Sequence, residues 1–234
     1  HTRTEDARGR RRASWTRSRP KSCVQVPKMG GQKELRLHEL EFVGREEARE
    51  ALSCILHTIL FCRAPGPFRP QTVHAEHLDL AYARVGSGSV CRSVDSAVES
   101  VLRRESLVSA GPELLRGDVV LSFFERRRSR SLFGLVSSEE KVTWEQWTAP
   151  FLVSVRPPNE LELRRTRVSA DVQLRGTVSD IYAIVNGPLD HVPSSMYEFE
   201  ISRNPTVVSD REEPTDGGYA RVILNPPLYN LSSL

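Results

Sequence analysis

The sequence predicts an α+β fold in which a mixed or antiparallel sheet packs on a long central helix. Segments with apolar residues at helical spacing occur between segments in which apolar and polar residues alternate. Two alternating segments follow each other directly, as in a hairpin, and a long helical segment comes after them. The chain has 234 residues, of which 38% are hydrophobic. That content is sufficient for a core, and we expect one domain over residues 29–225.

The first half of that domain is expected to contain two strands and two helices. Residues 34–43 form a strand with a register break near Glu39. Residues 45–62 form a helix with Ala48, Ala51, Leu52, Ile55, Leu56 and Ile59 at helical spacing. Residues 77–85 form the second strand, and residues 93–104 form the second helix. Gly86 to Ser89 is expected to be a loop between them.

The second half is expected to contain a hairpin and the long helix. Residues 119–125 and 144–155 alternate, and the segment between them is too polar for a core, so this hairpin should project. The helix over residues 159–185 is expected to end at Asn186-Gly187-Pro188. Its expected inner face consists of Val168, Val172, Val178, Ile181, Tyr182 and Val185. Short strands over residues 197–201 and 219–224 complete the domain.

The two ends of the chain differ from this body. Residues 1–33 carry ten Lys and Arg against two acidic residues, whereas the remainder carries 23 against 28. Residues 1–28 have no apolar periodicity and are predicted to be a disordered basic extension. Met29 is a candidate start, which would leave residues 1–28 outside the native protein. Residues 226–234, which begin with two prolines, are expected to be an extended tail.

The cysteines and the hydropathy favour a cytoplasmic protein. Cys23, Cys54, Cys62 and Cys91 have no disulfide-framework spacing, which favours a reducing compartment. No apolar run is long enough for a transmembrane helix, and the N-terminus lacks the apolar region of a secretory signal.

No motif of a known catalytic or cofactor site occurs. The sequence contains no G-x-S-x-G, P-loop or G-x-G-x-x-G, so neither an enzyme nor a bound cofactor is expected. His74 and His77 with Cys54 or Cys62 match no common zinc spacing, so no metal site is expected. His57 is interpreted as a satisfied or half-buried helical histidine rather than a catalytic base.

The projecting hairpin is the candidate binding surface. Leu132 and Phe133 lie in its polar connection with no local core to enter, which favours an exposed anchor for a partner. Arg126, Arg127, Arg128 and Arg130 could bind nucleic acid or acidic lipid, but a solvated arm is the favoured interpretation. Arg130, Trp144 and Trp147 are possible supporting residues. The two tryptophans are three positions apart, so only one of them should be buried if the segment is regularly extended.

Three groups of residues resemble the autophagy-related protein 101 family. They are Glu47-Ala48 with Leu56-His57-Thr58-Ile59-Leu60, then Phe123-Phe124-Glu125 before the basic run, and Trp144-Glu145-Gln146-Trp147-Thr148. The resemblance covers roughly residues 33–201 and implies a HORMA-like domain. It also implies a hairpin loop whose tryptophan and phenylalanine recruit downstream factors. Phe133 matches that phenylalanine, and Ser131-Leu132 stands where the tryptophan would be.

The resemblance implies a non-catalytic adaptor or scaffold subunit of the autophagy-initiating serine/threonine kinase complex. Such a protein pairs with the HORMA domain of autophagy-related protein 13, contacts downstream autophagy factors and is recruited from the cytoplasm to the phagophore assembly site. Two alternatives remain open. One is a HORMA protein of the chromosome or checkpoint type, and the other is a nucleic-acid-associated protein that acts through residues 1–28.

Overall fold

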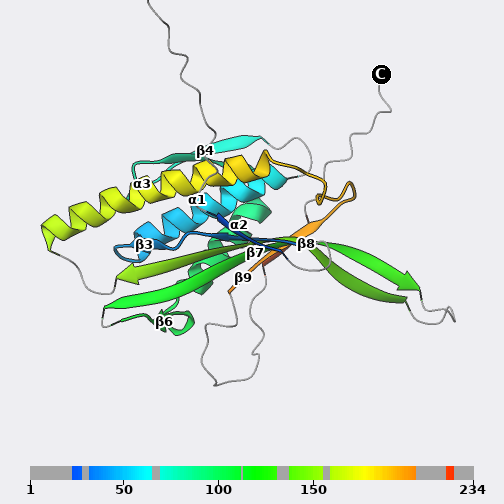
Figure 1. The fold of residues 1–234 in the computed structure, drawn as a ribbon, viewed down its shortest axis with the longest axis horizontal. Helices are drawn as coiled ribbons and strands as arrows, with labels where there is room; N and C mark the ends of the chain where they lie inside the picture. The colour runs from blue at the N-terminus through cyan, green and yellow to red at the C-terminus, as the bar shows by residue number, and fades with distance from the viewer. Residues whose placement is uncertain are drawn as a thin grey trace, which may run out of the picture.

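The computed structural model is described for residues 23–27, 32–64, 69–111, 113–130, 137–154, 159–203 and 220–223. It confirms the α+β class: three α-helices pack with a mixed sheet (Figure 1). Over the described ranges this sheet has eight strands, and its main order is β1-β2-β8-β7-β9-β10. The arrangement fits the single HORMA-like domain that the resemblance implies.

The centre of the sheet is the long hairpin of β7 (Leu114–Arg130) and β8 (Ser137–Ser154). β9 (Glu198–Arg203) pairs with the outer edge of β7, and β10 (Ala220–Ile223) pairs with β9. The short strand β6 (Val108–Ser109) also pairs with β7. The predicted hairpin strands are therefore correct in place but too short, since both continue outward beyond the body.

The predicted register break in the first strand is confirmed. β2 (Lys33–Leu37) and β3 (Leu40–Phe42) both run parallel to β8. Arg36 lies opposite Thr148, and Leu40 lies opposite Phe151. The connection from β2 to β3 therefore contains one residue more than the stretch of β8 that it faces. Pro150 lies in this interval and has no backbone N–H for a ladder hydrogen bond, which favours a break there.

Helix α1 (Arg45–Arg63) is the most enclosed element of the fold. It lies between the sheet and α3, and every residue from Ala51 to Leu60 is buried (Figure 1). Gly44 precedes it with φ of +93°, which a residue with a side chain rarely adopts. The prediction of this helix was correct, but α1, rather than the long helix, occupies the centre.

Helix α3 (Glu160–Val185) begins where the sequence predicts. The Asn159 side chain accepts a hydrogen bond of 2.9 Å from the Glu162 backbone N–H, which caps the first turn. The helix ends at Val185, and the Gly187 N–H donates to the Ile184 carbonyl at 3.1 Å.

The predicted inner face of α3 was partly wrong. Ile181 and Val185 are buried and Val178 packs against the core, but Val168, Val172 and Tyr182 are 65%, 64% and 42% exposed. The buried face instead carries Ala170, Leu174, Thr177, Ile181 and Val185. Those positions follow the helical period, whereas the prediction combined apolar residues from opposite sides of the helix.

The region between α1 and β7 differs from the prediction at both ends. β4 (Pro70–His74) was not predicted, and it pairs with β5 (Ala81–Val85) in a separate two-stranded sheet. β5 is therefore shorter than the predicted strand over 77–85. Helix α2 (Gly88–Val101) begins inside the predicted Gly86 to Ser89 loop, and the 3₁₀ turn Arg104–Ser106 follows it.

The chain ends are only partly described. β1 (Cys23–Pro27) lies within the interval that the sequence predicts to be disordered, and it pairs antiparallel with β2. Residues 1–22 and the predicted tail over 226–234 lie outside the described residues. The domain boundaries at residues 28 and 225 therefore stay predictions.

Ile55 provides a test of the enclosed position of α1. Its side chain is fully buried, so Ile55→Ala should lower the free energy of unfolding by about 2–5 kcal/mol, measured by urea denaturation. Val172→Ala on the exposed side of α3 is the control, and it should change that free energy by less than about 0.5 kcal/mol. Equal losses in the two variants would contradict the helix phases described above.

Candidate protein-interaction surface

The hairpin of β7 and β8 leaves the body as a two-stranded ribbon, as predicted (Figure 1). Its ladder continues from Glu125 opposite Val142 to Arg130 opposite Ser137. Leu132 and Phe133, the predicted anchor, fall in residues 131–136, outside the described residues, as does the side chain of Arg130. The ends of the two strands thus frame the predicted binding loop at the far end of the ribbon.

Charged side chains tie the base of the ribbon to β9. Arg126 Nε lies 2.7 Å from Glu198 Oε1, and Lys141 forms an ion pair with Glu200. Both cations also cover the buried Phe124: Lys141 Nζ is 4.3 Å and the Arg126 guanidinium carbon 6.0 Å from its ring centroid. Two-stranded ribbons are marginal in water, so these contacts stabilise its base.

The prediction that only one tryptophan is buried was wrong. Trp144 and Trp147 both lie in the core. Phe123 pairs with Glu145 but Phe124 with Thr143, so Trp144 is the extra residue of a β-bulge. A bulge shifts the alternation of the strand, and residues three positions apart can then lie on one side. Trp144 stacks on Phe123 at 5.3 Å and meets Tyr197 edge to face at 4.9 Å.

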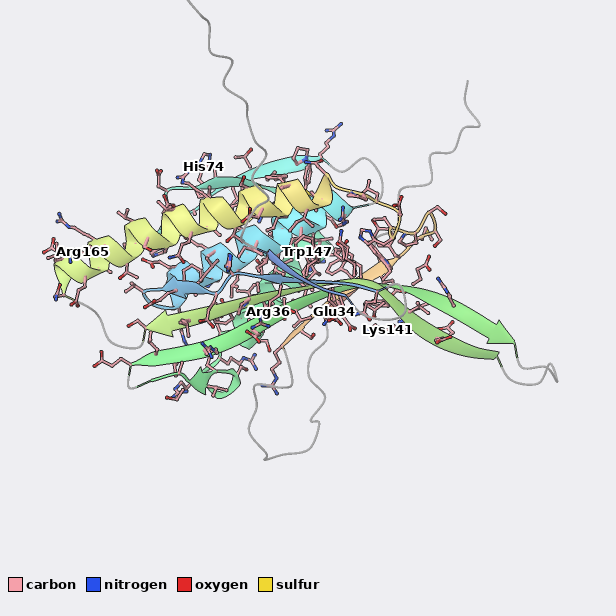
Figure 2. The ribbon with its side chains drawn as sticks, viewed as in Figure 1. Glu34, Arg36, His74, Lys141, Trp147 and Arg165 are labelled. Atoms are coloured by element: carbon pink, nitrogen blue, oxygen red, sulfur yellow. The ribbon has the colours of Figure 1, made fainter. Side chains whose placement is uncertain are left out.

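The same bulge places Glu145 at the centre of a buried polar network. Arg63, at the end of α1, donates to its two carboxylate oxygens at 2.9 and 3.1 Å. Trp147 Nε1 donates to it at 2.5 Å, and the His191 ring lies 2.5 Å from it. Figure 2 shows Trp147 in the interior beneath the helices and Lys141 at the base of the ribbon. Sequence reasoning missed Arg63 and His191, because they are far from the tryptophan motif in the chain.

The protonation of Glu145 follows from these partners. Burial by itself would raise the pKa of this carboxyl, but the hydrogen bonds and charge of Arg63, with His191 and Trp147, hold the pKa below its ordinary value. Glu145 is therefore charged in the folded protein. A carboxyl with a lowered pKa stabilises the fold at neutral pH, and that contribution is lost in acid as it becomes protonated.

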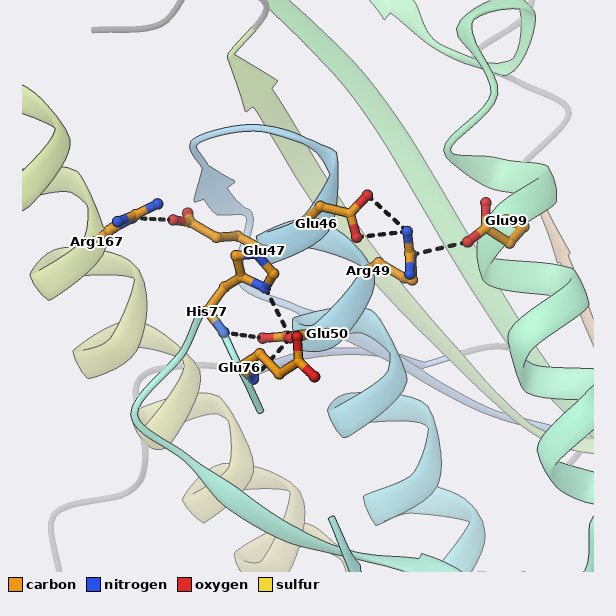
Figure 3. A network of polar contacts seen from close by, with 8 residues as sticks. All are labelled: Glu46, Glu47, Arg49, Glu50, Glu76, His77, Glu99 and Arg167. Carbon is orange, nitrogen blue, oxygen red and sulfur yellow. Dashed lines mark hydrogen bonds and ion pairs between the residues drawn. The ribbon is translucent and has the colours of Figure 1, made fainter. Parts of the chain in front are cut away.

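A second network joins the start of α1 to its neighbours (Figure 3). The buried Glu47 accepts from Arg167 of α3 at 2.6 Å and from the Val43 N–H at 3.1 Å. Glu50 accepts from the backbone N–H groups of residues 76 and 77, both at 2.9 Å. The His77 ring also lies 3.0 Å from Glu50, and this contact raises the pKa of His77. These contacts fix α3 and the β4-β5 sheet on α1.

His57 differs from its predicted environment. It is fully buried in α1 and stacked on Tyr82 at 6.3 Å, and its Nδ1 has no hydrogen-bond partner among the described residues. Burial lowers the pKa of His57 to about 4, and the charge of Arg84 contributes to the shift. The prediction of a satisfied or half-buried ring was therefore wrong for the described surroundings of His57, and its structural rather than catalytic role stays a prediction.

The outer side of α3 is a second candidate surface. We call it the α3 stripe, and it consists of Leu161, Val168, Val172 and Tyr182. These positions recur on one side of the helix, and the four side chains are between 42% and 65% exposed. Exposed apolar residues in such an array are typical of protein interfaces. The sequence prediction missed this surface because it assigned three of the four residues to the core.

The described residues offer little for other kinds of site. They contain no group of three His, Cys, Asp or Glu side chains that could hold a metal ion. A cavity of about 430 Å³ between α3 and the β2–β3 connection is lined by polar residues such as His38, Gln173 and Asp180. In the same part of the chain, no helix combines the length and apolar character needed to span a membrane.

The described residues form an α+β protein with a projecting ribbon and an exposed apolar stripe on α3. The family model of autophagy-related protein 101 matches residues 41–198. The chain is 30% identical to autophagy-related protein 101 of Arabidopsis thaliana over 191 residues, which cover 71% of this chain and 84% of that protein. The chain belongs to the autophagy-related protein 101 family, and its role is therefore related to autophagy.

Animal relatives show the same similarity over a shorter stretch. The chain is 28% identical to the Xenopus laevis protein over 161 residues, covering 63% of this chain and 70% of that one. It is 28% identical to the Homo sapiens protein over 144 residues, covering 56% and 62%. Both relatives are named autophagy-related protein 101.

Breaking the buried ion pair should strongly destabilise the fold. Glu145→Gln removes the charge that compensates Arg63, so the free energy of unfolding should fall by about 3–5 kcal/mol in urea denaturation. Arg164→Gln, which breaks the exposed pair of Arg164 with Glu160, is the matched control and should cost less than about 1 kcal/mol. The interpretation fails if both variants lose the same small amount.

His57 should make the protein sensitive to mild acid. The unfolded chain takes up a proton near the ordinary pKa of 6.5, but the folded chain does so only near 4. Stability should therefore be complete above about pH 6.5 and fall by roughly 3 kcal/mol as the pH approaches 4. His57→Leu should remove most of this loss, measured by urea denaturation at pH 7.5 and 4.5. An unchanged pH dependence in His57→Leu would assign the acid sensitivity to other groups.

Proposed function

We propose that this chain is a non-catalytic adaptor subunit of the autophagy-initiation kinase complex. It pairs with the HORMA domain of autophagy-related protein 13 and recruits downstream autophagy factors through Leu132 and Phe133. Family membership supports the role in autophagy. The observation that carries the recruitment is the ribbon, which leads away from the body to an apolar pair between Arg130 and Gly134.

The mechanism is the presentation of an apolar anchor on a stiffened arm. The ribbon base is stabilised by the ion pairs of Arg126 and Lys141 with β9. An anchor on a pre-organised element loses less conformational entropy on binding than one on an unstructured loop. Phe133 supplies the aromatic area, and Leu132 occupies the place of the family's tryptophan. Buried aromatic anchors commonly contribute most of the binding energy of an interface.

The α3 stripe supports the pairing with a second HORMA domain. It provides apolar area on a rigid helix that lies over the body, whereas the ribbon projects beyond the body (Figure 1). Two partners can therefore bind at the same time. We place the protein in the cytoplasm, from which the assembled complex is recruited to the phagophore assembly site.

A crossed co-purification experiment tests both contacts. Leu132→Ala with Phe133→Ala should abolish co-purification of downstream autophagy factors from cells while autophagy-related protein 13 is retained. Val168→Glu with Val172→Glu should abolish co-purification of autophagy-related protein 13, because it places charges in an apolar interface. Melting temperatures should change little in either variant, since neither pair fills the core.

The outcomes separate the two claims. Normal recruitment by the folded Leu132/Phe133 variant would refute the tip as the anchor. Normal binding of autophagy-related protein 13 by the folded Val168/Val172 variant would refute the α3 stripe as the pairing surface.

A further inference from the structure

As far as the structure describes the chain, the edge of β7 is open along the ribbon. β9 pairs with β7 from Val119 opposite Arg203 to Phe124 opposite Glu198, and its ladder ends there. From Glu125 to Arg130, the only strand that pairs with β7 in the described part of the chain is β8. The residues before β9 do not continue the ladder, because Tyr197 turns into the body, where its hydroxyl donates to the Arg63 carbonyl.

An open strand edge is a template for another extended chain. Its backbone N–H and C=O groups can pair with an incoming strand, and its side chains at alternate positions select the sequence. Near Glu125 the loop before β9 contacts the edge through the Ser195 hydroxyl, which donates to the Glu125 carboxylate. A strand that followed the line of β9 outward would meet residues 125–130 on a side where β7 pairs with no other strand of the described residues.

β9 indicates which sequence suits this edge. Its glutamates alternate with apolar residues, and Glu198 and Glu200 pair with Arg126 and Lys141 across Phe124. Beyond Phe124, β7 has arginine at positions 126, 128 and 130, which is the same period of two. An incoming strand with acidic residues at alternate positions would extend the charge pattern that β9 begins.

The arginines also exclude other occupants. A second copy of β7 would bring arginines against arginines, and like charges across a ladder are destabilising. A strand rich in lysine would meet the same repulsion. On the face that carries Arg126, Arg128 and Arg130, β8 adds Lys141 and Glu139, so the cations outnumber the acid. This positive surplus disfavours self-association and favours an extended segment of opposite charge.

We propose that the β7 edge over residues 125–130 binds an acidic, extended peptide segment of a partner protein by strand addition. The segment lies antiparallel to β7 and in line with β9. This inference rests on the proposed function, because it assigns a second contact to the recruiting ribbon, beside the tip. Main-chain hydrogen bonds hold the partner, and the arginines select its charge.

A peptide of alternating glutamate and valine, eight residues long and labelled with fluorescein, tests the proposal with the full chain. Fluorescence anisotropy should show saturable binding, and hydrogen exchange should slow at backbone amides within residues 125–130. Two matched peptides are controls. One carries lysine in place of every glutamate, and the other carries N-methyl groups on alternate backbone nitrogens. Both should bind at least about tenfold more weakly.

Variants of the protein provide the second part of the test. Arg128→Ala with Arg130→Ala should weaken binding of the glutamate peptide by about tenfold. Arg164→Ala with Arg165→Ala removes the same charge from the exposed start of α3, at the other end of the molecule, and should leave binding unchanged (Figure 1). Leu132→Ala with Phe133→Ala should also leave it unchanged, because the tip lies beyond the edge.

Several results would overturn strand addition. They are equal binding of the N-methylated peptide, equal binding of the lysine peptide, protection that maps outside residues 125–130, or no binding at millimolar peptide. The failure of the adaptor role is a separate result, because it is detected by co-purification with the Leu132/Phe133 variant. Loss of peptide binding with intact recruitment would reject only the edge site.

Discussion

The rest of the fold depends on the buried ion pair of Arg63 and Glu145. It joins the end of α1 to the bulge in β8, and Arg63 also reaches the Val185 carbonyl at the end of α3 at 3.4 Å. A buried carboxylate is costly to desolvate unless its oxygens are hydrogen-bonded. Here Arg63, Trp147 and His191 all bond to it, so the charge is compensated only when these segments are in place. The pair thus favours one arrangement of the helices, the sheet and the loop after α3 that contains His191.

Glu47 has a similar role at the other end of α1, where it is buried against Arg167. Both acids belong to the segments that carry the resemblance to the family, and the tryptophans beside Glu145 are buried as well. Those segments therefore belong to the packed body of the domain.

The separation of the two exposed surfaces follows from the same body. α3 is fixed on α1 by Glu47 and by the face that contains Leu174 and Ile181, which leaves the α3 stripe outward. The ribbon is fixed at its base by β9 and by the cations that cover Phe124. The α3 stripe and the ribbon thus lie on regular elements that are held to the body by separate contacts, and this separation supports the proposed binding of two partners.

The sequence by itself determined the α+β class, the order of the main strands and helices, the break near Glu39 and the ends of α3, since these depend on local spacing, caps and glycines. Tertiary structure decided which apolar residues face inward. Val168 and Val172 look like core residues in isolation, but α3 can bury only one side, and Glu47 and α1 select the side with Ala170 and Leu174. Trp144 is buried because of a β-bulge that the sequence around it does not predict. Arg63 contacts Glu145 only after α1 and β8, which are far apart in the chain, have packed together. Such pairings are set by the three-dimensional packing of segments far apart in the chain, which local periodicity does not encode.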